Sequence, residues 1–283
     1  MKNITKILSI LILLSLASCN LERAIEIDLP KGKDQLVVEC YLEHGKPYQL
    51  LLTETVPYLS PPNGTAFGLP DVLGATVSII HNNKVITLIY KPNIDTSNNK
   101  VFNYTSAELV DSTIKGDYSL FVRDTKGREI TAKTRFLPKL PINEISWEFD
   151  TDPLKVDTAR KALILVRHNK LSATQRHRLQ IGKVNNEDTL KLKTETDFTY
   201  VGIFSTNNVV TIGTRYLFKK KDTVFVRLFN IEQQYYDYKR SVDASQGANG
   251  NPFAQPVSIT SGVQGGIGVF TTLVYDKRNI IIE

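Results

Sequence analysis

Cys19 is the residue whose setting points most directly to chemistry. Lys2 and Lys6 give the chain a positive start, residues 7–16 form an apolar run interrupted only by two serines, and small residues lie directly before the thiol. A positive start, a short apolar run and small residues before a cleavage point are the pattern of a secretory signal. The run is far shorter than the roughly 20 residues of a membrane-spanning helix, so it predicts export followed by removal.

The segment Leu16-Ala17-Ser18-Cys19 resembles the bacterial lipobox. The resemblance implies cleavage between Ser18 and Cys19, a diacylglyceryl thioether on the Cys19 sulfur, and a further acyl chain such as palmitate on the new amino terminus. A single acyl chain binds a membrane only marginally, at about 0.8 kcal/mol per buried methylene, whereas two or more anchor a protein stably. We therefore predict a lipoprotein. The alternative is an ordinary signal peptide followed by an accidental cysteine.

The charge pattern of the chain disfavours nucleic acid as a partner. The net charge is +6, charges of both signs are interspersed, and two of the positive charges lie in the signal. The densest basic run, Lys219-Lys220-Lys221, is typical of a solvated loop or strand end. Once Cys19 is modified, Cys40 has no cysteine to pair with, so we expect no intramolecular disulfide. We expect Cys40 to pack as a small apolar residue.

The other candidates for catalysis or metal binding lack the spacing that such sites need. The histidines are His44, His81, His168 and His177, and none lies in a zinc-type His-x-x-x-His pattern. His44 and His81 are typical of turn residues. The glycine-rich run 262–268 lacks the lysine and hydroxyl of a phosphate-binding loop, so we interpret it as a bulge or a close backbone approach. We expect no catalytic residue, no metal and no cofactor.

Several hydroxyl side chains follow an aspartate in a pattern that resembles the periplasmic O-glycosylation motif of Bacteroidota. They are Ser112, Thr158, Thr189 and Thr223. An aspartate before a threonine-led strand is also ordinary turn chemistry, so both interpretations stay open. An intact mass of the mature protein without hexose-sized increments would exclude glycosylation.

Apolar residues that alternate between turn formers predict a mainly β chain. In the first part we expect strands at residues 35–42, 48–53, 74–80, 85–90, 116–123 and 129–136, with a long exposed loop at 57–70. Short strands at this spacing predict a β-sandwich. The order Gly-Ala-x-Val, Gly-x-Tyr-x-Leu-x-Val and Asp-x-x-Gly over residues 74–127 resembles the transthyretin-like or carboxypeptidase-regulatory type of immunoglobulin-like sandwich.

The second part is also dominated by predicted strands. We expect them at residues 142–149, 162–167, 176–184, 198–204, 215–219 and 223–230, followed by a loop at 245–256 and a tail that returns to the sheet. One short helix is expected at 231–242. Its three tyrosines, Tyr235, Tyr236 and Tyr238, either line a binding groove or pack on the sheet.

Pro138 and Pro141 set the expected boundary between the two parts, because proline has no amide hydrogen to donate to a strand pair. We therefore predict two tandem β-sandwich-like domains with one short helix in the second. The expected division is a signal peptide at residues 1–18, a lipidated tether at 19–33, an immunoglobulin-like sandwich at 34–138 and a second β-rich domain at 139–283.

The segment 251–256, Asn-Pro-Phe-Ala-Gln-Pro, is followed by Gly-Gly-Ile-Gly-Val-Phe at 265–270. Together they resemble the closing signature of the lipoprotein family called domain of unknown function 4249. Earlier hallmarks occur in order at Leu36–Glu39, Gly74–Val77 and Gly116–Leu120. The resemblance implies an outer-membrane lipoprotein of Bacteroidota, often encoded near TonB-dependent receptors. It supplies no catalytic residues, because the activity of the family is unassigned.

The residues directly after Cys19 can indicate on which side of the membrane the protein lies. In these bacteria an acidic cluster at this place would resemble a surface-export signal, and the segment Asn20-Leu21-Glu22-Arg23 lacks such a cluster. We therefore leave the periplasmic and cell-surface faces open. The preferred hypothesis is a noncatalytic accessory or binding lipoprotein that partners a TonB-dependent transporter. The alternative is an extracytoplasmic hydrolase whose site is assembled from scattered residues.

Overall fold

The computed structural model describes residues 34–56, 68–95, 100–151, 160–170, 174–184, 192–202, 208–248, 255 and 257–283. The predicted signal, the tether, and with them Ser18 and Cys19, lie outside these residues. So do Thr158, Thr189 and most of the predicted loop at 57–70. No helix in the described ranges is both long enough and apolar enough to cross a membrane.

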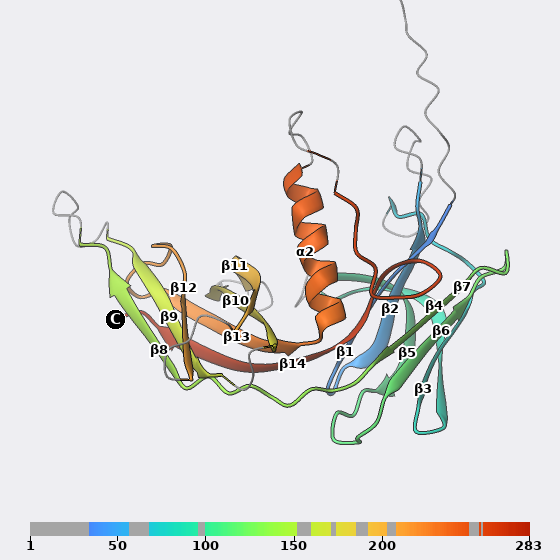
Figure 1. The fold of residues 1–283 in the computed structure, drawn as a ribbon, viewed down its shortest axis with the longest axis horizontal. Coiled ribbons are helices and arrows are strands. Elements are labelled where there is room, and N and C mark those ends of the chain that lie inside the picture. The colour runs from blue at the N-terminus through green and yellow to red at the C-terminus, as the bar shows by residue number, and fades with distance from the viewer. Residues whose placement is uncertain are drawn as a thin grey trace, which may run out of the picture. The chain divides into compact units, whose positions relative to one another are not determined.

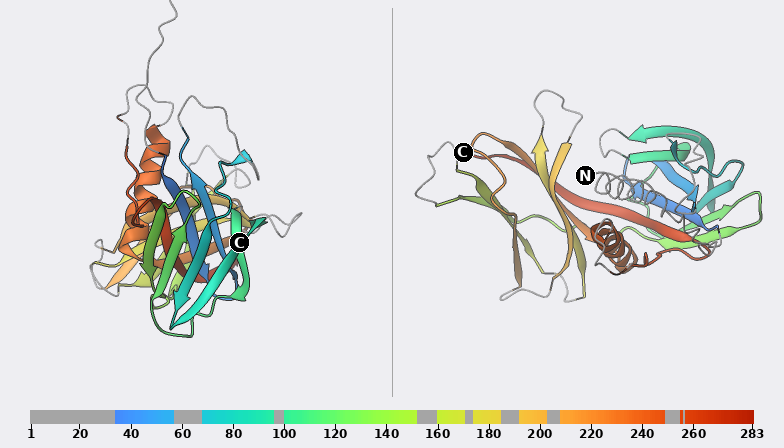
Figure 2. Two further views of the ribbon diagram at one scale, coloured as in Figure 1. Left: turned by 90° about the vertical axis from the view of Figure 1, so that its right-hand side faces the viewer. Right: turned by 90° about the horizontal axis from the view of Figure 1, so that it is seen from above.

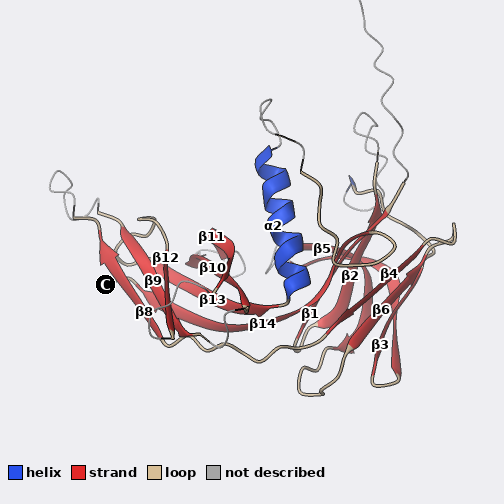
Figure 3. Ribbon diagram, in the orientation of Figure 1, coloured by secondary structure: helices blue, strands red, loops and turns tan. Residues whose placement is uncertain are grey.

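The chain is mainly β, as the sequence predicts (Figure 3). The strands of the first part are β1 (Leu36–Glu43), β2 (Pro47–Glu54), β3 (Thr76–His81), β4 (Lys84–Asp95), β5 (Lys100–Leu109), β6 (Tyr118–Arg123) and β7 (Glu129–Thr134). Those that follow are β8 (Glu144–Phe149), β9 (Ala162–Asn169), β10 (Arg176–Val184), β11 (Leu192–Val201), β12 (Val209–Gly213), β13 (Thr223–Ile231) and β14 (Ile267–Ile281). The helix α2 (Gln233–Ala248) lies between β13 and β14 (Figure 1).

Strands β1 to β7 form one end of an 11-stranded sheet, in the order β1-β2-β5-β4-β3-β6-β7. Strict alternation on β1 places Leu36, Val38, Cys40 and Leu42 in a core shared with all the other strands of this group. Cys40 is therefore buried as a small apolar residue, as predicted, and burial raises the pKa of its thiol. The sheet curves back on itself, because β7 exchanges two backbone hydrogen bonds with Gln264, just before β14.

The glycine run before β14 is explained by close backbone approach, which confirms the interpretation from sequence. A Cβ on Gly268 would overlap the Val38 carbonyl oxygen, and a Cβ on Gly265 would overlap the Glu129 carbonyl oxygen. Both glycines also have positive φ angles, +137° and +82°, which residues with side chains rarely adopt. The glycines let the chain pass between β1 and β7.

The second group of strands forms two layers. The sheet β12-β9-β8 packs against the other end of the large sheet, β11-β10-β13-β14, over a second apolar core. On β13, Val226 and Leu228 point into this core, whereas Phe229 and Ile231 point to the opposite face. Helix α2 packs on that opposite face, so β13 is buried on both sides.

Strand β14 joins the two groups. Residues 267–273 pair in parallel with β1, and residues 274–281 pair antiparallel with β13. The right-hand view of Figure 2 shows β14 as one long strand running through both groups. Strand β14 belongs to both groups, because Phe270 packs in the first core and Ile280 packs against the second. The predicted domain boundary at residues 138/139 therefore stays a prediction.

The structure differs from the predicted elements at several points. Residues 215–219 form no strand, because only Phe218 pairs, through a single bridge to Ala162. Strands β5 and β12 were not predicted; β5 carries polar residues in its centre, where Asn103 is buried. The helix runs to Ala248, beyond the predicted end at 242, into the predicted loop at 245–256. His44 lies in a turn as predicted, but His81 ends β3 and stacks on Tyr118.

Candidate binding site on the helix-bearing face of the sheet

The face of the sheet that α2 covers carries a group of polar and aromatic side chains. On β1, Glu39 and Tyr41 point away from the apolar core, because the buried residues alternate with them. Helix α2 lays Tyr235 and Tyr238 against this face, with both rings almost fully buried. The predicted helix tyrosines therefore pack on the sheet, and their hydroxyl groups enter a hydrogen-bonded network.

Glu39 accepts hydrogen bonds from two tyrosines. Its Oε2 atom lies 2.8 Å from the hydroxyl of Tyr41, and its Oε1 atom lies 3.2 Å from the hydroxyl of Tyr238. Burial, followed by the nearby Glu39 charge, raises the pKa of both tyrosines above the ordinary value. The phenols therefore stay protonated and donate to the carboxylate.

Arg178 and Asp197 form a second centre, on β10 and β11. Two guanidinium nitrogens of Arg178 donate to the two Asp197 carboxylate oxygens at 2.7 and 2.6 Å, and a third donates to the Tyr235 hydroxyl at 2.7 Å. Burial opposes the charge on Asp197, but the hydrogen bonds and charge of Arg178 outweigh it and lower the pKa of Asp197. The bidentate geometry fixes the guanidinium plane.

Lys100, the first residue of β5, lies over the same face. Its Nζ atom is 3.2 Å from the centroid of the Tyr41 ring. Burial lowers the pKa of Lys100 to about 8, the charges of Glu39 and Asp197 acting in the opposite direction. Within the described residues the ammonium has a ring face as its partner and no hydrogen-bond acceptor, so the N–H groups that point away from the ring are available to a ligand.

The two centres touch through aromatic rings. Tyr41 and Tyr235 meet edge to face, with centroids 5.9 Å apart. Further arginines lie over rings on the same face: Arg227 is 5.6 Å from the Tyr275 ring, and Arg176 is 5.2 Å from the Tyr236 ring. An array of donors, acceptors and ring faces of this kind is suited to recognising a polar partner.

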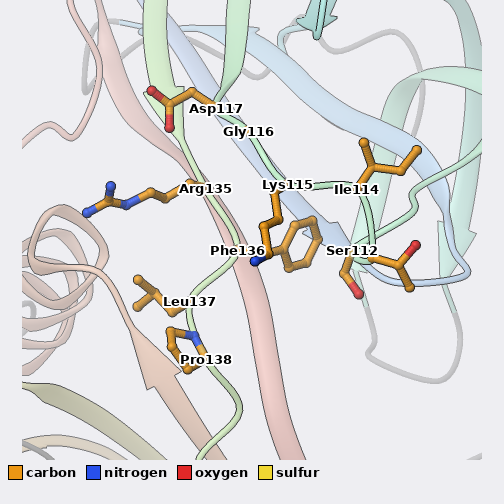
Figure 4. A pocket seen from close by; sticks show the side chains of 10 residues that line it. Ser112, Ile114, Lys115, Gly116, Asp117, Arg135, Phe136, Leu137 and Pro138 are labelled. Carbon is orange, nitrogen blue, oxygen red and sulfur yellow. The ribbon is translucent and has the colours of Figure 1, made fainter.

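A separate cavity of about 480 Å³ lies between the loop 112–117 and the segment 135–138 (Figure 4). Its charged lining residues are Lys115, Asp117 and Arg135. Asp117 is the single carboxylate among the ten lining residues, so the cavity brings together no pair of acids such as a glycosidase needs.

Residues 22–279 match a family model described as a domain of unknown function (DUF4249). The chain belongs to the DUF4249 family. No curated protein matches it. The matched range includes every residue of the binding face, so the network is part of the DUF4249 domain itself.

Two of the predicted glycosylation residues lie in the described part of the DUF4249 chain. Ser112 is at the cavity of Figure 4, next to Asp111, whose Oδ1 accepts from the backbone and hydroxyl of Thr113 at 2.9 and 2.7 Å. Thr223 begins β13. Asp111 thus makes the turn contacts of the alternative interpretation, and glycosylation at these sites stays a prediction.

The sequence did not single out Lys100, Arg178 or Asp197. Arg178 and Asp197 are polar residues that each precede an apolar residue on a strand, which is also how a solvated strand face looks, and Lys100 begins β5, a strand that the sequence did not predict. Their meeting depends on the pairing of β10 with β11, on the place of β5 beside β2 in the sheet, and on the packing of α2 over that sheet. The one local signal was the cluster of tyrosines in α2, for which a binding groove was one of the two hypotheses.

Proposed function

We propose that this DUF4249 protein is a noncatalytic, lipid-anchored binding component of the outer membrane of a Bacteroidota bacterium. The signal pattern and the lipobox-like residues before Cys19 support the anchor. The proposal leaves the periplasmic and cell-surface faces open. We further propose kinship of the first group of strands with the transthyretin-like sandwiches, on the motifs at residues 74–127.

The tyrosine, arginine and lysine network beside α2 is the observation that carries the proposal. Tyrosine and arginine are enriched among the residues that dominate binding energy at interfaces. Lys100 offers N–H donors with no acceptor among the described residues, in a partly desolvated setting where a new hydrogen bond is strong. The proposed recognition surface is Glu39, Tyr41, Lys100, Arg178 and Asp197 with the tyrosines of α2.

The same contacts favour recognition over hydrolysis. Both oxygens of Glu39 accept from tyrosines, and Asp197 is held as a carboxylate by Arg178. A general acid or base needs a free oxygen directed at a substrate. These carboxylates instead order the side chains around them.

We propose a TonB-dependent transporter as the partner. The test is affinity purification of the epitope-tagged full chain from detergent-solubilised native outer membranes, followed by mass spectrometry. Lys100→Gln removes the charged donor, and Lys84→Gln, in an exposed ion pair with Glu108, is the matched control. We expect a transporter to co-purify with the wild type and the control, and recovery to fall about fivefold or more with Lys100→Gln. Repeated purifications that contain no transporter would overturn the proposal that the partner is a TonB-dependent transporter.

The anchor has its own test. Cells labelled with a palmitate analogue should yield a labelled wild-type protein and an unlabelled Cys19→Ala protein. Equal labelling of the two would exclude lipid on Cys19.

A further inference from the structure

Buried polar atoms without hydrogen-bond partners gather at the start of β10. In the described part of the chain they include the Oδ1 atom of Asn230 and the ring nitrogens of His177, which make no hydrogen bond of normal geometry although the Phe229 backbone is close to the ring. His177 and Asn230 are both at most 1% exposed. Buried polar groups nearly always have a partner, and leaving one unpaired costs about 1–3 kcal/mol. Such a group of atoms points to a ligand that completes it.

Strand register brings these atoms to one place. His177 on β10 is the direct neighbour of Asn230 on β13 and of Tyr200 on β11. Directly opposed residues in an antiparallel pair share a face, with Cβ atoms roughly 4.5–5.5 Å apart. His168 on β9 faces them from the other sheet, its ring centroid 5.1 Å from that of His177. The site lies between the two layers of the second group of strands.

The ring of His168 is oriented as a metal ligand would be. Its Nδ1 atom lies 2.9 Å from the carbonyl oxygen of Asn169, which accepts a hydrogen and so assigns the ring proton to Nδ1. Its Nε2 atom then carries the lone pair and accepts a hydrogen bond from the Tyr200 hydroxyl at 2.8 Å, and a metal ion on Nε2 would take the place of that hydrogen. A backbone carbonyl behind one ring nitrogen is the usual support for metal binding by the other.

Arg176 precedes His177 on β10, so its side chain points to the other face of the sheet. There its guanidinium lies 5.2 Å from the centroid of the Tyr236 ring.

We propose that His168, His177 and Asn230 bind one divalent first-row transition metal ion, of the zinc or copper class, with Tyr200 at the edge of the site. Two imidazole nitrogens and an amide oxygen suit such an ion better than magnesium or calcium. Two imidazoles on a tetrahedral ion, with bonds of about 2.0–2.1 Å, place their ring centres roughly 5 Å apart. The ion would tie β9 to β10 and β13 across the two layers.

The spacing of histidines along the chain does not reveal this site, and for that reason the sequence predicted no metal. His168 and His177 lie on consecutive strands of different sheets, and Asn230 is far along the chain. The inference does not depend on the proposed binding role of the α2 face.

The test uses the full chain without a histidine tag, stripped with a chelator and dialysed against zinc. We expect about one zinc per chain by elemental analysis and a higher unfolding temperature with zinc than without it. His177→Phe should lose both effects, and Asn230→Leu should weaken binding about tenfold or more. The control, His44→Ala, changes the exposed turn histidine and should bind as the wild type does.

Uptake that survives His177→Phe, or an absence of uptake by the wild type, would overturn the site. Should the variants fail to fold, copper(II) electron paramagnetic resonance of the wild type decides. Hyperfine splitting from two imidazole nitrogens supports the site, and a signal from one nitrogen or none contradicts it.

Discussion

The two groups of strands treat buried polar side chains differently. In the first, Asn103 is buried and makes three hydrogen bonds, to the backbone nitrogen and oxygen of Leu52 and to Asp71. Asp124 is likewise satisfied by Arg128 and two backbone amides. In the second, His177 and Asn230 keep unpaired atoms within the described residues. Asn103 and Asp124 are therefore fully paired within the fold, whereas among the described residues the second group holds buried polar atoms that the fold does not pair.

Both groups contribute charged side chains to the face of the sheet that α2 covers. The first group contributes Glu39, Tyr41 and Lys100 to that face, and the second contributes Arg178 and Asp197. The two contributions meet because β14 pairs with both β1 and β13. The seam at β14 therefore both holds the fold together and assembles the proposed recognition surface.

Gly268→Ala tests the seam and should have the largest effect. The new methyl group would overlap the Val38 carbonyl oxygen in a backbone conformation that alanine rarely adopts. We expect a loss of about 4 kcal/mol or more in the free energy of unfolding, measured by urea denaturation. Gly247→Ala, with open space around the Cβ position, is the control. A loss below about 1 kcal/mol would show that the close approach is not needed.

Asn103→Ala tests the completed hydrogen bonding of the first group. It removes three bonds and leaves the backbone of Leu52 without the side-chain partner. We expect the free energy of unfolding to fall by about 2–4 kcal/mol. Thr87→Ala, on the exposed face of β4, should change it by less than about 0.5 kcal/mol. Equal losses of unfolding free energy in the two variants would show that the buried hydrogen bonds of Asn103 do not stabilise the first group.

The loss of stability at acidic pH tests the hydrogen bonding of Asp124, which also lies in the first group of strands. Burial raises the pKa of Asp124, but the hydrogen bonds from Arg128 and the amides outweigh burial, and the net shift is below the ordinary value of 3.8. The group therefore stabilises the fold above that value, and this contribution is lost as the pH falls through the lowered pKa. Urea unfolding at a series of acidic pH values should show a shallower decline for Asp124→Asn. If the unfolding free energies of the wild type and Asp124→Asn fell in parallel with pH, the stabilising role of the Asp124 carboxylate would be contradicted.

His177→Phe tests the second group and should have the smallest effect on the metal-free protein. The substitution removes two unpaired nitrogens and fills similar space, so the unfolding free energy should change by no more than about 1 kcal/mol. In the zinc-loaded protein the same change should abolish the stabilisation by zinc. A large loss in the metal-free protein would mean that His177 has an essential partner in the fold.

Much of the fold follows from local pattern. Residues 176–184 form β10 with the predicted bounds, because polar and apolar residues alternate cleanly between turn formers. Strand β5 escaped prediction because Asn103 is polar yet buried, satisfied by a residue about 50 positions away. The parallel pairing of β1 with β14 joins the two ends of the described chain, and local periodicity holds no information on it.

The candidate sites were less accessible to sequence than the fold. Arg178 finds Asp197 only through the β10–β11 register, and Lys100 finds Tyr41 only through the path of β5. His168 and His177 meet across two sheets. Each of these contacts is a property of the packing of strands, which single-residue spacing does not encode.

Photo-crosslinking in native cells tests the central claim, that recognition lies on the face of the sheet that α2 covers and not on the exposed side of β4. A photoreactive amino acid would replace Arg240, exposed on α2, or Thr87, exposed on β4. We predict a crosslink to a TonB-dependent transporter from position 240 and none from position 87. Crosslinking from position 87 alone would place recognition on the exposed side of β4, away from α2, and contradict the account.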